Sequence, residues 1–267
     1  MVVTDRMMGV LRLLEGDGWS DGAAHAVTEA AGVLGVDGII VCLSIDGGSA
    51  LEPMWFSDPA ARAFSDLQFT CGQGPSLDSM RHCSTVRVVD LDSVREDRWP
   101  ALTAVDTGPT RGVFCFPLRV GALRIGVMTL LRSRPGSLTG TANRDADLLA
   151  RALTRFCLGQ AADGSPDRPD PPLPGFLESG LGDGELPENG GRLERAEIHQ
   201  ATGMLSVQLR LPLPDALVRL RALAYTSGDP VGDVAHAIVT RRLRLDEDDT
   251  DDTDDDPHPL DDKDPPA

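Results

Sequence analysis

The spacing of apolar residues divides the first 159 residues into helical and strand-like segments. Helices are predicted where apolar residues recur every three or four positions, which places them on one face of the helix. The segments with this spacing are residues 4–16, 20–35, 58–69, 74–83 and 143–159. Each of these helices has one apolar face to bury, so each needs a sheet or another helix as its partner.

Short apolar runs rich in β-branched residues predict strands between those helices. These runs are residues 38–45, 51–56, 85–91, 112–120 and 123–133. Only a short turn around Gly121 separates the last two runs, which indicates an antiparallel hairpin. A sheet that contains a hairpin and carries packed helices is an α+β architecture, so we expect one α+β domain over residues 1–159.

Helical spacing returns over residues 192–245, in three short segments. Three short helices must share one core, and small side chains let their backbones approach closely. A glycine inside a helix costs about 1 kcal/mol relative to alanine, and we expect close packing at Gly203 to offset that cost. The residues expected in this core are Ile198, Ala201, Gly203, Leu205, Ala216, Leu220, Ala224, Val234, Ala235 and Ile238.

Two segments lack the pattern of a packed core. Residues 160–191 hold six prolines and seven glycines, a composition typical of a flexible linker. Residues 246–267, DEDDTDDTDDDPHPLDDKDPPA, are almost purely acidic, and self-repulsion with little apolar surface predicts a disordered tail. The expected organisation is therefore an α+β domain at 1–159, a linker, a small all-α domain at 192–245 and an acidic tail.

Charge is unevenly distributed along the chain. The formal net charge is −17, which argues against non-specific adhesion of the whole molecule to nucleic acid. Residues 192–245 instead contain eight arginines against five acidic residues. Arginine can donate two hydrogen bonds to a phosphate and can stack on unpaired bases. Each of these side chains could equally belong to a solvated helix face. The candidate RNA contacts are Arg219, Arg221, Arg241, Arg242 and Arg244.

The remaining chemistry of the chain is sparse. Five cysteines occur, without any CxxC pair, and four of them lie in or beside apolar runs. This pattern predicts free thiols in a reducing cytoplasm. No apolar run is long enough to span a membrane. Zinc-ligand spacing, a phosphate-cradling loop and a nucleophile elbow are also missing from the sequence. We therefore expect no metal site and no enzyme, and the pattern identifies no cofactor.

The order of several segments in the first domain resembles the GAF domains of actinobacterial regulators. LQFTCGQGPSLDSM, VRVVDL, RWPAL and GVFCFPLRVGALRIGVMTLLRSRPGSL carry the resemblance, which covers about residues 5–158. It implies an antiparallel sheet with a pocket for a small-molecule ligand between the sheet and its helices. The side chains expected to wall this pocket, or else to belong to the core, are Trp55, Phe69, Cys71, Phe114 and Cys115.

The pattern of small and apolar residues over 192–245 resembles the ANTAR domain, the three-helix RNA-binding output module of transcription antitermination regulators. Ile198, Ala201 and Leu205 begin this pattern, and Val234 and Ile238 end it. Together the two resemblances imply a transcription antitermination regulator that senses a signal and binds a hairpin loop of structured leader RNA. They also imply a homodimer, because ANTAR modules pair on tandem hairpins.

Two other functions fit the sequence. The C-terminal helices could serve only as a dimerisation or protein-docking module that does not bind RNA. A partner that binds independently of salt, with no RNA in the purified protein, would indicate this function. The GAF-like pocket could instead be catalytic, and turnover of a candidate ligand would indicate that.

Overall fold

A computed structural model describes residues 4–15, 21–45, 50–162 and 190–243 of the chain. The chain divides into two compact units, Met1–Glu185 and Leu186–Ala267. Helices extend into both ends of the expected linker, because one helix continues to Ala162 and the next begins at Gly190. The rest of that linker, Arg244 and the whole acidic tail lie outside the described residues.

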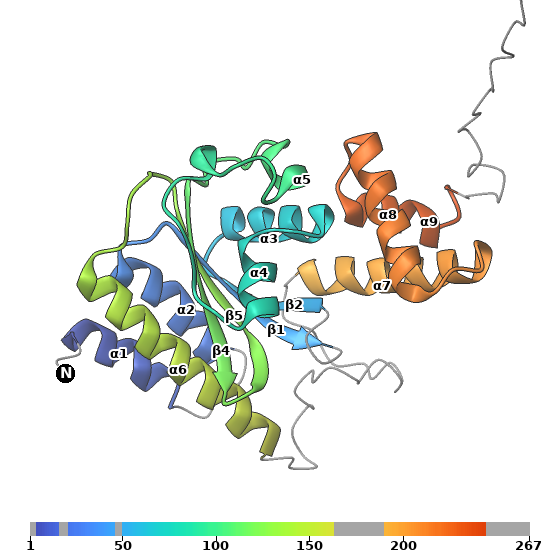
Figure 1. Cartoon of the computed structure of the whole chain (residues 1–267). Helices are drawn as coiled ribbons and strands as arrows, with labels where there is room; N and C mark the ends of the chain where they lie inside the picture. Colours follow the sequence, from blue (N-terminus) through green and yellow to red (C-terminus); the bar gives the residue numbers. More distant parts are fainter. Residues whose placement is uncertain (1–3, 16–20, 46–49, 163–189, 244–267) are drawn as a thin grey trace, which may run out of the picture. The chain divides into compact units, whose positions relative to one another are not determined.

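A five-stranded sheet forms the centre of the first unit (Figure 1). Its strands are β1 (Gly38–Ile45), β2 (Ala50–Phe56), β3 (Val86–Val88), β4 (Gly112–Val120) and β5 (Leu123–Arg132). Their order is β2-β1-β5-β4-β3, and each neighbouring pair is antiparallel. The predicted hairpin is confirmed, since β4 and β5 pair directly on either side of Gly121. Strand β3 is shorter than predicted, because the short 3₁₀ helix η2 (Leu91–Ser93) follows it.

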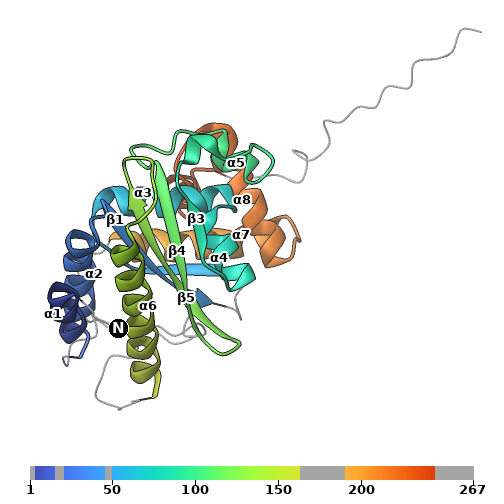
Figure 2. The same cartoon turned by 60° about the vertical axis from the view of Figure 1, so that its left-hand side comes forward.

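Helices cover both faces of the sheet, as Figures 1 and 2 show from two directions. On one face lie α1 (Asp5–Leu13), α2 (Asp21–Leu34) and α6 (Gly140–Ala162). On the other face lie α3 (Pro59–Cys71), α4 (Pro75–His82) and the short α5 (Pro100–Thr103). This arrangement confirms the α+β architecture with an antiparallel sheet and flanking helices.

Strand β4 shows why the sheet needs helices on both sides. Its residues Gly112–Phe116 are all buried. Successive side chains of a strand point to opposite faces. Phe114 and Phe116 therefore pack with the α1, α2 and α6 side, whereas Val113 and Cys115 pack with the α3, α4 and α5 side. The apolar run GVFCF thus serves two separate cores.

The second unit consists of three helices, α7 (Gly190–Gln208), α8 (Leu213–Ser227) and α9 (Val231–Val239). Chain-reversing turns separate them. The Leu211 N–H donates to the Ser206 carbonyl at 3.1 Å and closes the end of α7, next to the two prolines that precede and open α8. Gly228 ends α8 in the left-handed conformation, with φ of 74°, which glycine adopts without steric cost. The predicted three-helix, all-α unit is confirmed.

Glycine is required where strands approach most closely in the sheet. Gly126 of β5 pairs with Leu43 of β1 and Leu118 of β4. A Cβ atom at this position would collide with the carbonyl oxygen of Cys42. Backbone atoms of a central strand cannot move aside as a flexible side chain can, so this glycine permits the close approach of β1.

The first prediction concerns Gly126→Ala, which we expect to destabilise the first unit by about 1–3 kcal/mol or more, because the added methyl overpacks the sheet. Gly32→Ala is the matched control. Gly32 is exposed in α2, and a Cβ there meets no atom within 4 Å. The control should therefore gain about 0.5–1 kcal/mol from improved helix propensity. Urea unfolding followed by circular dichroism measures both, and equal stability of the two variants would contradict the close approach.

Candidate functional site

The core of the helical unit is built from small and aliphatic side chains. Ala201, Leu205, Ala216, Leu220 and Ala235 have no exposed surface. The other expected core positions Ile198, Ala224, Val234 and Ile238 are also buried. Alanine at four of these positions lets the helix backbones come close together, so a small unit can exclude water from its centre.

Gly203 is the exception, and the expectation of close packing there is wrong. The residue is only half-buried, and a Cβ atom built on it meets no atom within 4 Å. Its position in α7 lies between the buried Thr202 and Leu205, on a flank of the helix that no neighbouring helix covers closely. Nothing in the described structure offsets the helix propensity lost at Gly203.

The candidate RNA-binding arginines do not form one cluster. Arg219 and Arg221 are half-buried on either side of Leu220 in α8. Residues two positions apart lie about 200° apart around a helix, so these two side chains leave on different flanks. Arg241 and Arg242 are exposed together just after α9. Arg244 lies outside the described residues.

Two arginines occupy helix ends in a backbone conformation that favours glycine. Arg210 follows α7 with φ of 53°, and Arg241 follows α9 with φ of 59°. The left-handed region is disfavoured for residues with a side chain, whereas a cation near a helix C-terminus is stabilised by the helix dipole. Both positions therefore place a positive charge beside the negative end of a helix. The spacing of apolar residues gave no sign of this role for Arg210.

One polar contact links the first and last helices of the unit. Nδ1 of His236 in α9 lies 3.1 and 3.2 Å from the two carboxylate oxygens of Glu197 in α7. Both side chains are half-buried. This contact holds α9 against α7, so the end of α9 that carries Arg241 and Arg242 has a fixed place in the unit.

In the first unit, the five side chains expected to wall one pocket lie on two faces of the sheet. Trp55 and Phe114 are buried on the face covered by α1, α2 and α6, where the Trp55 ring packs edge-on against Phe156 at 6.1 Å. Cys115 is buried, and Cys71 half-buried, on the opposite face. Phe69 is half-buried near the end of α3. A single pocket walled by all five is therefore excluded, because adjacent strand residues such as Phe114 and Cys115 point in opposite directions.

A buried polar cluster lies beside Cys115 on the α3 and α4 face. The Ser76 hydroxyl accepts a hydrogen bond from Gln68 Nε2 at 3.0 Å and lies 2.9 Å from the Thr129 hydroxyl. The Ser76 N–H donates to Gln68 Oε1 at 3.0 Å, and the Thr129 hydroxyl donates to Cys115 Sγ at 3.5 Å. These partners satisfy one another inside the core, as buried polar groups must. The cluster has no signal in the sequence, because its members come from four separate elements.

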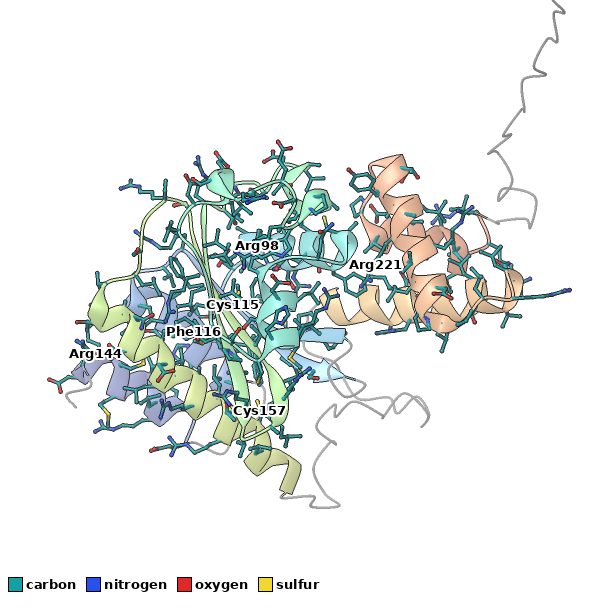
Figure 3. The ribbon with its side chains drawn as sticks, in the orientation of Figure 1. Arg98, Cys115, Phe116, Arg144, Cys157 and Arg221 are labelled. Carbon is teal, nitrogen blue, oxygen red and sulfur yellow. The ribbon has the colours of Figure 1, made fainter. Side chains whose placement is uncertain are left out.

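The connection between β3 and β4 closes this face. Trp99 is buried there, and its Nε1–H donates to Asp78 at 3.1 Å. The guanidinium of Arg98 lies 4.2 Å from the centre of the Trp99 ring and 3.7 Å from Asp78 (Figure 3). Arg111, the last residue of the connection, donates from its guanidinium to Asp90 near the start of the connection at 2.8 Å and lowers the pKa of that carboxyl group. Trp99 and Leu102 of this connection are buried in the same apolar cluster as Cys115, so the connection covers this side of the sheet.

A cavity of about 470 Å³ lies elsewhere, between α6, the end of β4 and the turn after α4. None of the five expected pocket residues lines it. Its charged groups are Arg119 and the pair formed by Arg151 and Asp147, which are 2.8 Å apart. With these charged groups in its lining, the cavity is suited to a small polar molecule. The remaining lining residues are Cys83, Ser84, Thr85, Phe116, Pro117, Gly121, Ala150 and Thr154.

Across residues 4–15, 21–45, 50–162 and 190–243, no three His, Cys, Asp or Glu side chains gather where they could hold a metal ion. Within the same ranges, no helix has both the length and the apolar character needed to cross a membrane.

The helical unit matches a known domain family. The family model of the ANTAR domain matches residues 192–239, a segment that runs from the first turn of α7 to the last residue of α9. The family match and the boundaries of the three helices therefore identify the same part of the chain. A comparison with curated proteins found no match.

Several solved structures are similar to this chain, and three of them illustrate the range. The GAF domain of a phosphoenolpyruvate-protein phosphotransferase from Acinetobacter is 14% identical, with a TM-score of 0.48, and the match covers 61% of this chain and 96% of that one. The corresponding GAF domain from Coxiella burnetii is 13% identical, with a TM-score of 0.46, over 60% and 96% of the two chains. A free methionine-R-sulfoxide reductase from Neisseria meningitidis is 17% identical, with a TM-score of 0.45, over 59% and 90%.

The second prediction concerns the cysteines, whose burial differs. Burial raises the pKa of the Cys115 and Cys157 thiols to about 12 each (both labelled in Figure 3). At pH 8 only about one such thiol in ten thousand is ionised, and the thiolate is the reactive form. Brief treatment of the native chain with N-ethylmaleimide at pH 8 should therefore modify the half-buried Cys71 and Cys83 first.

Mass spectrometry of the digested protein locates the modified cysteines. The control is the same reaction in guanidinium chloride, where Cys115 and Cys157 should react as fast as the other cysteines. Rapid modification of Cys115 in the native chain would show that the α3 and α4 face is open to solvent, contrary to the packing described above.

Proposed function

We propose that this chain is a signal-responsive regulator that binds structured RNA through its C-terminal helical unit and thereby promotes transcription antitermination. The observation that carries the proposal is the match of the ANTAR family model to residues 192–239, on the three helices themselves. ANTAR domains are the RNA-binding modules of such regulators.

The charge of the helical unit supports RNA as the partner. Its acidic residues Asp215 and Asp233 sit in the first turns of α8 and α9, where they stabilise helix N-termini. The exposed arginines Arg241 and Arg242 lie at the opposite end of α9. An RNA partner would be read at an unpaired loop, because the major groove of an A-form helix is too narrow for side chains.

The first unit would supply the signal in this proposal. Its similarity to GAF domains supports a sensory role, and the resemblance of its segments to those of actinobacterial regulators points the same way. Two places could receive a small molecule. The cavity beside Arg119 is open, whereas the polar cluster around Ser76 is covered by the connection that carries Trp99. A ligand for the polar cluster would have to displace that connection.

A second candidate function is protein docking or dimerisation through the helices, without RNA. Four large apolar side chains of the helical unit are exposed, and this observation favours the alternative. Val218 and Tyr225 lie on one face of α8 and are 61% and 50% exposed. Val207 and Leu213, near the turn between α7 and α8, are 80% and 59% exposed. Sedimentation of the double variant Val218→Ser with Tyr225→Ser, followed by RNA titration, would separate the candidates. Loss of association while RNA binding is retained would assign this face to docking.

The test of the proposed function is crosslinking of RNA to the full chain in cells that express it, followed by sequencing of the captured RNA. The proposal requires enrichment of transcripts that form hairpins with unpaired loops. Recovery of no RNA above the level of an uncrosslinked control would contradict RNA binding and leave the docking function as the better account.

The third prediction concerns the charges at the end of α9. Arg241→Glu combined with Arg242→Glu should weaken binding to a captured hairpin RNA about 10-fold or more at low salt, because two phosphate contacts are lost. The slope of log affinity against log salt concentration should decrease in magnitude by about 1–2. Fluorescence anisotropy of labelled RNA measures both quantities.

The matched control makes the same change in net charge on the first unit. Arg6 and Arg155 are both exposed there, and we expect Arg6→Glu combined with Arg155→Glu to leave the affinity nearly unchanged. Equal losses in the two double variants would mean that net charge alone, rather than the end of α9, governs binding.

A further inference from the structure

Two exposed cations stand at the end of the helical unit without acidic partners. We call Arg241 and Arg242 the α9 terminal pair. Within the described residues, no carboxylate lies within 4 Å of either guanidinium, and the one side-chain contact is from Arg242 Nε to the Thr240 hydroxyl at 3.1 Å. Arg95, Arg111 and Arg151 of the first unit, by contrast, each pair with an aspartate. The charge of the pair is therefore available to another partner.

The backbone of the pair is held in place by the turn that ends α9. The Arg241 N–H donates to the Ile238 carbonyl at 2.9 Å, and the Arg242 N–H donates to the Ala237 carbonyl at 2.8 Å. The Leu243 N–H donates to the same Ala237 carbonyl at 3.0 Å. Arg241 accepts the left-handed conformation within this turn, at a cost of about 1–2 kcal/mol for a residue with a side chain. The backbone positions from which the two side chains leave are therefore defined at the helix end.

The chain supplies a strongly opposite charge directly after this turn. Residues 246–267 contain twelve acidic residues and a single lysine, and nine of the twelve fall within 246–256. The segment therefore accounts for 11 of the 17 net negative charges of the whole chain. Such a run next to two uncompensated arginines is a case of charge complementarity within one polypeptide.

The length of the acidic segment permits it to return to the pair. About ten residues separate Arg242 from the aspartates at 251–256. A random-coil chain of ten residues has a root-mean-square span of about 16–19 Å, and repulsion between like charges extends it further, so ten residues are long enough to bring a carboxylate beside a guanidinium. Tethering at such short range gives an effective concentration on the order of millimolar.

We propose that residues 246–256 dock on the α9 terminal pair and occupy the positions that RNA phosphates take in the proposed function. The inference rests on that function for the identity of the competitor, while the docking itself rests on the charges and the geometry of the helix end. RNA must then displace the acidic segment before it can bind. Weak, non-specific RNA is excluded by this competition, whereas a hairpin with additional contacts to the helices is retained.

The experiment compares the full chain with a variant of equal length in which the nine acidic residues of 246–256 become their amides, Asp→Asn and Glu→Gln. Binding of a labelled 20-nucleotide polyuridine is titrated at 50 mM and at 1 M salt. With an effective concentration near 1 mM and a weak contact of about 0.1 mM, the amide variant should bind about 10-fold tighter at low salt. The difference should vanish at 1 M salt, where the Debye length is about 3 Å.

A second background distinguishes docking on the pair from general repulsion between the tail and RNA. The same amide substitutions are introduced into a chain that carries Arg241→Gln and Arg242→Gln. Docking predicts that the gain in affinity falls from about 10-fold to less than 2-fold, because the tail no longer has a site to block. An equal gain in both backgrounds, or equal affinity of the full chain and the amide variant at low salt, overturns the proposal.

A measurement without RNA separates this inference from the function on which it rests. The Nε–Hε resonances of Arg241 and Arg242 in the full chain should shift when the nine acidic residues become amides. Unchanged resonances would overturn docking. If no form of the chain binds RNA while the resonances do shift, the tail docks on the pair and the proposed RNA function is the part that fails.

Discussion

The central hairpin of the first unit is buried on both faces, and the rest of that unit follows from this constraint. A strand such as β4 presents Phe114 to one side and Cys115 to the other, so neither side can face water. Helices α1, α2 and α6 cover one face, and α3, α4 and the connection bearing Trp99 cover the other. Within the described residues, a ligand of this unit would use the cavity beside α6, at the edge of one core, or displace part of a cover.

The helical unit meets a different constraint, which is its small size. Its helices are 19, 15 and 9 residues long, and isolated helices shorter than about 12–15 residues are marginal in water. They are held by one shared core of alanine, leucine, isoleucine and valine, together with the contact between His236 and Glu197. With its small side chains inside and its arginines at helix ends and flanks, the unit can present positive charge without weakening its core. An apolar core with positive charge on the surface is the arrangement that the proposed RNA-binding function requires.

Much of the architecture was predictable from the sequence, because the spacing of apolar residues indicates which face of each helix or strand is buried. The strand at 38–45 and the hairpin around Gly121 were predicted at their observed positions. These features depend on local pattern and on glycine at a left-handed position. The three-helix unit was likewise visible in its spacing of small and apolar residues.

Details of the sites were less predictable, because they depend on contacts between distant segments. The expected pocket combined Phe114 with Cys115, although strand alternation places adjacent residues on opposite faces. Gly203 was expected to pack closely because a glycine inside a helix is unfavourable unless packing offsets its cost. Its flank of α7 is nevertheless open. The cluster of Gln68, Ser76 and Thr129 gave no signal, since no spacing along the chain links three separate elements.

The central claim, that the helical unit carries the RNA-binding surface, is tested most directly by locating RNA crosslinks on the protein. The full chain would be irradiated with bound RNA, digested with nuclease and protease, and the peptides that retain a nucleotide would be sequenced by mass spectrometry. The account predicts crosslinked peptides from residues 190–243, concentrated at the end of α9 and on α8. Crosslinks confined to the first unit would contradict it, whatever the affinity of the complex.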